Sequence, residues 1–170
     1  MLFRSAAIDD PDPVIMVEHK GLYAMRVPEP EVLPILPIGK AAIRRPGRDL
    51  TIASYGGALR AVSETAAMLS AEGIETEIVD LQSLQPWDEA TVLESLSRTH
   101  RLLIVHEAVE AFGVGAEIAA RMADIGFDEL DAPILRVGAP FMPSPVAKAL
   151  ERRYMPNTDS ILAACRRLLA

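Results

Sequence analysis

Cysteine, histidine and positive charge are scarce in this 170-residue sequence. The single cysteine, Cys165, has no partner for an intramolecular disulfide, so we expect a small buried residue and a fold that depends on its hydrophobic core. The three histidines are scattered and do not match the ligand spacing of a zinc site, so we predict no metal. The net charge of −7, without a clustered basic face, argues against a nucleic-acid partner and favours a basic one.

Long apolar runs are missing as well. No stretch approaches the roughly 20 residues that span a bilayer, so we predict no membrane partner. The first residues reach acids and prolines before the apolar core of a signal peptide could form. These features predict a cytoplasmic protein, or an organellar one if the source is eukaryotic.

Strand-like and helix-like segments alternate through the second part of the chain. Residues 50–55, 74–81, 101–106 and 132–137 have the apolar patterns of strands, and helical patterns lie between and after them. This alternation predicts an α/β fold with three layers, a mostly parallel open sheet and helices on both faces. The first part is expected to differ, with a short helix at 2–10, a buried strand at 13–17 and an extended proline-rich stretch at 27–47.

Two glycine turns and one histidine are the candidate chemical motifs. Gly113 and Gly115 precede a helix, but Ile118 stands where the dinucleotide fingerprint needs its third glycine, and the spacing at Gly56 fails too. We therefore favour tight turns and close backbone approach over anion binding. His106 ends a central strand, yet no serine or cysteine nucleophile accompanies it, so a structural or subunit-contact role is favoured over acid–base chemistry.

Segments along nearly the whole chain resemble, in order, the β subunit of the thiamin-diphosphate-dependent pyruvate and branched-chain 2-oxoacid dehydrogenases. The matching segments are DDPDPVIMVEHK at 9–20, LPIGKA at 36–41, VDLQSLQPWD at 79–88, VHEA at 105–108, FGVGAEIA at 112–119, LDAP at 130–133, PSP at 143–145 and YMPN at 154–157. The resemblance implies that residues 1–30 close a pyrimidine-binding domain, 31–47 form a linker, and 48–170 form a transketolase-type C-terminal domain.

The resemblance also implies a function. The implied parent enzyme decarboxylates a 2-oxoacid on thiamin diphosphate and magnesium, and transfers the acyl group to a lipoyl-bearing dihydrolipoyl acyltransferase. The family's catalytic, cofactor and metal residues fall outside the matched segments, so the chain is expected to bind no cofactor and to be an inactive assembly and docking part. The implied partners are an α subunit, a second β subunit and the binding domain of the acyltransferase.

The resemblance places the acyltransferase contact on Asp131 and on the terminal carboxylate of Ala170. Asp128 and Glu129 strengthen the negative field around Asp131, although such an acidic cluster is by composition alone a solvated surface. Arg166 and its neighbour in the last helix could instead neutralise the terminus.

Two alternatives stay open. The chain could be the C-terminal domain of an acetoin dehydrogenase or a transketolase-like enzyme. It could also be a free-standing regulatory or small-anion-binding α/β domain that uses its glycine turns.

Overall fold

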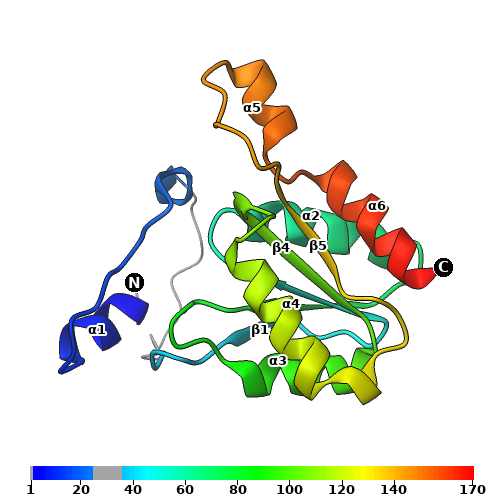
Figure 1. Cartoon of the computed structure of the whole chain (residues 1–170), viewed down its shortest axis with the longest axis horizontal. Coiled ribbons are helices and arrows are strands. Elements are labelled where there is room, and N and C mark those ends of the chain that lie inside the picture. The colour runs from blue at the N-terminus through cyan, green and yellow to red at the C-terminus, as the bar shows by residue number, and fades with distance from the viewer. Residues whose placement is uncertain (1, 25–35) are drawn as a thin grey trace.

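A five-stranded sheet forms the centre of the molecule. The structure, a computed structural model, describes residues 2–24 and 36–170 (Figure 1). The strand order is β1-β3-β2-β4-β5; β1 pairs antiparallel with β3, and the other neighbours are parallel. The strands are β1 (Ala42–Arg45), β2 (Leu50–Ser54), β3 (Thr76–Asp80), β4 (Leu102–Val109) and β5 (Leu135–Ala139).

Helices cover both faces of this sheet, so the predicted three-layer α/β fold is confirmed (Figure 1). One face packs against α2 (Ala58–Ala71) and α6 (Thr158–Leu169). The other packs against α3 (Glu89–Thr99) and α4 (Val114–Ile125), which η2 (Phe127–Glu129) follows. Outside these layers lie α1 (Leu2–Asp9), η1 (Lys20–Ala24) and α5 (Lys148–Tyr154). No helix of the described residues is long and apolar enough to cross a membrane.

The elements begin and end where the sequence supplies the required groups. Asp88, the predicted cap of α3, accepts a hydrogen bond from the Thr91 amide. Gly73 follows α2 with a φ of +82°, a backbone conformation that residues with a Cβ seldom adopt. Its N–H donates to the carbonyl of Ser70. The strands β2 and β3 are buried along their whole length, as expected of central parallel strands covered on both faces.

Cys165 lies on the buried face of α6, as predicted for a small apolar residue. Its neighbours in the core include Ile161 and Leu168 of the same helix. Burial raises the pKa of the Cys165 thiol to about 12, so the thiol stays protonated and unreactive at neutral pH.

Two predictions for the N-terminal part were wrong. Residues 13–17 form no strand, because no described strand lies beside them to pair with. The side chains of Ile15 and Val17 are 91% and 90% exposed. Within the expected linker, Ala42–Arg45 forms β1 instead, since its residues keep the N–H groups that prolines would remove. The predicted helix at the start of the chain is present as α1. Part of the proline-rich stretch, residues 27–35, lies outside the described residues, and the three-part division of the chain stays a prediction.

Candidate functional site

Asp131 lies in the turn that leads from η2 into β5. Its backbone N–H donates to the carbonyl of His100, 2.9 Å away, and the His100 ring nitrogen Nδ1 lies 2.9 Å from the carbonyl of Glu129. These contacts tie the turn to the end of α3. The Asp131 side chain is 58% exposed, so one face of its carboxylate is open to solvent.

Arg101 joins Asp131 to the end of α6. Its Nε donates to the carbonyl oxygen of Leu168 at 2.8 Å, and its Nη1 lies 3.9 Å from Asp131 Oδ2. A cation at this position satisfies a terminal carbonyl and complements the negative end of the helix dipole. The exposed Ala170 follows Leu168 by two residues. The structure thus brings Asp131 and the end of α6 to one edge of the sheet, which we call the docking edge.

The other predicted residues of this site lie on η2 or on α6. Asp128 is exposed and Glu129 is half-buried, both directly ahead of Asp131 in the chain. Arg166 turns away and pairs with Glu72 at 3.1 Å, so it does not neutralise the docking edge as the sequence had left possible. Sequence reasoning missed Arg101, whose only signal was a basic residue ahead of an apolar strand.

An apolar groove of about 490 Å³ lies on the other side of η2. Phe127 on η2 is 72% exposed at this groove, and Ile134 contributes from the approach to β5. The remaining lining residues are Ala116, Ala119, Ala120, Ala123, Leu130, Pro133 and Arg136. Acidic residues and an apolar groove therefore both border η2.

The carboxyl ends of β2 and β4 form a second candidate site, because ligands of open α/β sheets collect where the strand order reverses. His106 lies there, fully buried, with its ring stacked on Tyr55 at a centroid distance of 6.2 Å. Its Nδ1 is 3.0 Å from the Ala108 carbonyl, which can only accept, so Nδ1 carries the proton. Burial lowers the pKa of His106, and among the described residues Nε2 has no hydrogen-bond partner. The ring is neutral and shielded from solvent.

Three glycines make room for this histidine ring. A Cβ on Gly115 would lie 2.4 Å from His106 Nε2, and a Cβ on Gly113 or Gly138 would lie 3.0 Å from its Cε1. Side chains at these positions would overlap the ring. The glycines ahead of α4 thus serve close packing, which was the favoured sequence interpretation, and the ring occupies the space beside them that an anion would need.

A carboxylate lies at the N-terminus of α2, in the same region. A Cβ on Gly57 would lie 2.8 Å from both Glu107 carboxylate oxygens and 2.6 Å from His19 Nε2. His19 Nε2 and Glu107 Oε2 are 3.4 Å apart, which fastens the N-terminal segment to the domain. Burial and then the charge of Glu107 raise the pKa of Tyr55. The Glu107 carboxylate lies against the N-terminus of α2, the kind of helix end at which anions bind, so these residues do not fit a diphosphate.

A metal site is equally poorly supported. The described ranges, 2–24 and 36–170, contain no group of three or more His, Cys, Asp or Glu side chains placed to hold an ion. We derive no catalytic step from either the strand-end residues or the docking edge.

Comparisons with known proteins agree with the fold and with the predicted resemblance. The chain is 44% identical to the acetoin:2,6-dichlorophenolindophenol oxidoreductase subunit beta of Bacillus subtilis (strain 168), over 96% of this chain and 48% of that protein. It is 41% identical to the pyruvate dehydrogenase E1 component subunit beta-2, mitochondrial, of Oryza sativa subsp. japonica, over 95% of this chain and 44% of that protein. The chain thus spans about half the length of the curated relatives it matches.

A solved structure described as "Split gene transketolase, inactive beta4 tetramer" superposes with a TM-score of 0.71 at 26% identity, covering 85% of this chain and 45% of that one. The family model for "Transketolase, C-terminal domain" matches residues 39–161, and this range begins just before β1 and ends within α6. The chain therefore belongs to the family of transketolase C-terminal domains.

Proposed function

We propose that this chain is the C-terminal part of the β subunit of a thiamin-diphosphate-dependent dehydrogenase for a 2-oxoacid or acetoin, and that it serves assembly and docking. The observation that carries the proposal is the 41–44% identity to β subunits over nearly the whole chain. In the parent enzyme, thiamin diphosphate with magnesium would supply the carbon–carbon bond cleavage, which for a 2-oxoacid is a decarboxylation. This chain alone catalyses nothing, because its strand ends offer packed glycines and a carboxylate instead of a diphosphate cradle.

The proposed partners are an α subunit, a second β subunit and the basic binding domain of a dihydrolipoyl acyltransferase. The description of a structural neighbour as a β4 tetramer supports self-association of such chains. The compartment is the cytoplasm, or an organelle in a eukaryotic source, as the mitochondrial rice relative suggests.

The docking edge is the proposed contact for the acyltransferase domain. Asp131 and the carboxylate of Ala170 receive its basic side chains, and Asp128 and Glu129 strengthen the negative field. Arg101 supports this assignment, since one side chain holds both the turn of Asp131 and the end of α6 in place. The long 3.9 Å separation leaves the Asp131 carboxylate free to pair with a second, incoming cation.

Calorimetry with a cognate binding domain tests this proposal. Asp131→Ala should weaken binding at least about tenfold, roughly 1.4 kcal/mol, and a few residues added after Ala170 should act in the same direction. Asp124→Ala is the matched control, because Asp124 is an exposed acid on α4 that pairs with Arg121 instead. If neither Asp131→Ala nor the C-terminal extension changes the affinity, the acidic cluster is an ordinary solvated surface.

Small-anion binding is the second candidate, since the chain has two helix N-termini that follow glycines. The His106 ring and the Glu107 carboxylate oppose it, as they lie against those glycines. A thermal-shift screen against phosphates and nucleotides separates the two functions, and a saturable shift would favour the anion site.

A further inference from the structure

His100 directly follows α3 in a backbone conformation that favours glycine. Its φ of 58° and ψ of 8° lie in the left-handed region, which residues with a Cβ adopt less readily than glycine. Glycine is common directly after a helix for this reason, and Gly73 has that place after α2. A larger side chain kept in such a conformation points to a use for that side chain.

His100 holds the turn after η2 at two points. Its carbonyl accepts a hydrogen bond from the N–H of Asp131 at 2.9 Å. Its ring Nδ1 lies 2.9 Å from the carbonyl of Glu129, which can only accept, so Nδ1 donates. Between these two bonds lies Leu130, which packs against the core on the face of α3 and α4. One residue therefore fixes the backbone on both sides of Leu130.

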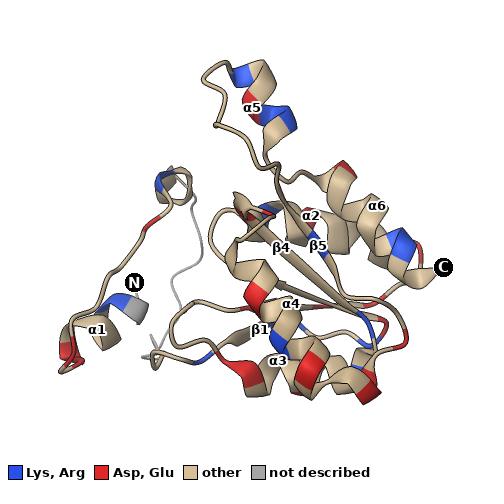
Figure 2. Ribbon diagram, in the orientation of Figure 1, with Lys and Arg blue, Asp and Glu red and all other residues tan. Residues whose placement is uncertain are grey.

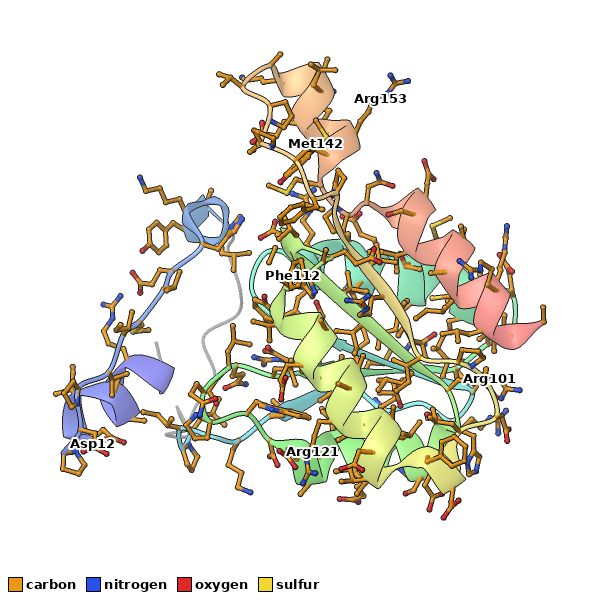
Figure 3. All side chains as sticks on the ribbon, in the orientation of Figure 1. Asp12, Arg101, Phe112, Arg121, Met142 and Arg153 are labelled. Carbon is orange, nitrogen blue, oxygen red and sulfur yellow. The ribbon has the colours of Figure 1, made fainter. Side chains whose placement is uncertain are left out.

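The direction of the Asp131 carboxylate depends on this backbone. Arg101 lies between the turn and the end of α6, and its Nη1 is 3.9 Å from Asp131 Oδ2 (Figure 3). That distance is too long for a hydrogen bond. Among residues 2–24 and 36–170, no closer ion pair orients the carboxylate, which is 58% exposed. The backbone of the turn therefore aims it.

Acidic side chains precede Asp131 in the chain. Asp128 and Glu129 lie on η2, next to the end of α4 (Figure 2). Their charges attract a basic partner from a distance, whereas a charge-assisted hydrogen bond needs a donor and an acceptor that meet in a defined geometry. A carboxylate that is in place before the partner arrives loses less entropy on binding. The contacts of His100 therefore bear on the strength of a bond to Asp131.

We propose that His100 is the positioning residue of the docking edge. Its ring and its carbonyl hold residues 129–131 so that the Asp131 carboxylate faces an incoming basic side chain of the acyltransferase domain. The inference rests on the proposed function and deepens it, because it names a residue that acts through Asp131. The donor on the ring matters, and the charge does not, since Nδ1 donates in both the neutral and the protonated ring.

Calorimetry with a cognate binding domain tests the proposal on variants of the full chain. His100→Asn keeps a donor nitrogen at the same place along the side chain and tolerates the left-handed conformation, so it should bind like the unmodified chain. His100→Gly also fits the backbone but has no donor, and its affinity should fall about fivefold, as for one lost hydrogen bond. Gln82→Gly is the matched control, because Gln82 has a φ of 59° but follows β3, and it should leave the affinity unchanged. Urea unfolding of each variant checks that the fold is intact.

A double-mutant cycle shows whether His100 acts through Asp131. In an Asp131→Ala background, His100→Gly should have no further effect on the affinity. A loss that persists in this background overturns the proposal. Equal affinities of the His100→Gly and His100→Asn variants overturn it too, because the two differ in the donor.

The outcomes also separate this inference from the proposed function. If Asp131→Ala weakens binding and His100→Gly does not, His100 alone loses its role and the docking edge stands. If the unmodified chain does not bind the domain, the proposed function fails and this inference fails with it. Hydrogen exchange of the Asp131 amide, measured without a partner, should be faster in His100→Gly than in His100→Asn. Equal exchange rates would contradict the hold of the ring on the turn.

Discussion

Gly115→Ala tests whether the glycine in the first turn of α4 is required by the close contact with His106. In a helix, alanine is favoured over glycine by about 1 kcal/mol, so propensity alone predicts stabilisation. The new Cβ, however, would lie 2.4 Å from His106 Nε2 and 2.6 Å from its Cδ2. The ring cannot easily retreat, because it is fully buried, stacked on Tyr55 and hydrogen-bonded to the Ala108 carbonyl. Overpacking of this kind costs about 1–3 kcal/mol and loss of the hydrogen bond about 0.5–1.5 kcal/mol.

The net expectation is that Gly115→Ala destabilises the fold by about 1–3 kcal/mol in urea unfolding. Ala120→Gly, at an exposed position of the same helix, calibrates the propensity contribution and should cost about 1 kcal/mol. In a His106→Ala background the clash is gone, so Gly115→Ala should become neutral or stabilising, which gives a coupling free energy of about 2–3 kcal/mol. If Gly115→Ala stabilises the unmodified chain by about 1 kcal/mol, the packing explanation is refuted and the anion alternative regains support.

Three further predictions concern cofactor binding, pH and the ion pair of Glu77 with Arg98. Calorimetry with thiamin diphosphate and magnesium should give no saturable micromolar isotherm, and such an isotherm would contradict the inactive assignment. Burial lowers the pKa of His106, so its contribution to stability is complete above the unfolded pKa of about 6.5 and declines as the pH falls below it. His106→Asn should flatten the pH dependence of urea-measured stability below about pH 6.5. Glu77→Ala should cost about 1–3 kcal/mol in urea unfolding, because it removes the hydrogen-bond partner of the buried Ser95 hydroxyl, whereas Arg98 is 44% exposed and keeps its pair with Glu94; a loss under about 0.5 kcal/mol would refute that expectation.

The sequence predicted the sheet well because its central strands are marked locally. Leu102 to Val105 is an uninterrupted apolar run, and such a run fits only a strand covered on both faces. The Asp88 cap and Gly73 likewise act within a few residues of their helix ends. The short strand β1 escaped prediction because flanking prolines dominate its neighbourhood, and its stability comes from pairing with β3, more than 30 residues later.

The candidate sites were less predictable, because they depend on contacts between distant segments. Arg101 reaches the Leu168 carbonyl across 67 residues, and no local pattern announces that bond. The contact of His19 with Glu107 and the ring contact of Phe112 with Phe141 are equally non-local. The glycine motif before α4 was visible, but only the folded structure shows that a histidine side chain lies against it.

The two ends of β4 and β5 carry surfaces of different character. At the amino ends, Arg101 and Asp131 present charge, which sets association rate and salt dependence. At the carboxyl ends, Phe112 and Phe141 present apolar surface, which sets the lifetime of a contact. Between them the His106 ring lies against Gly113, Gly115 and Gly138. Because the two surfaces share no residue, changes in one should add independently to changes in the other. A docking affinity that fell on loss of Phe141 would mean that the proposed acyltransferase contact extends to the carboxyl ends of the strands.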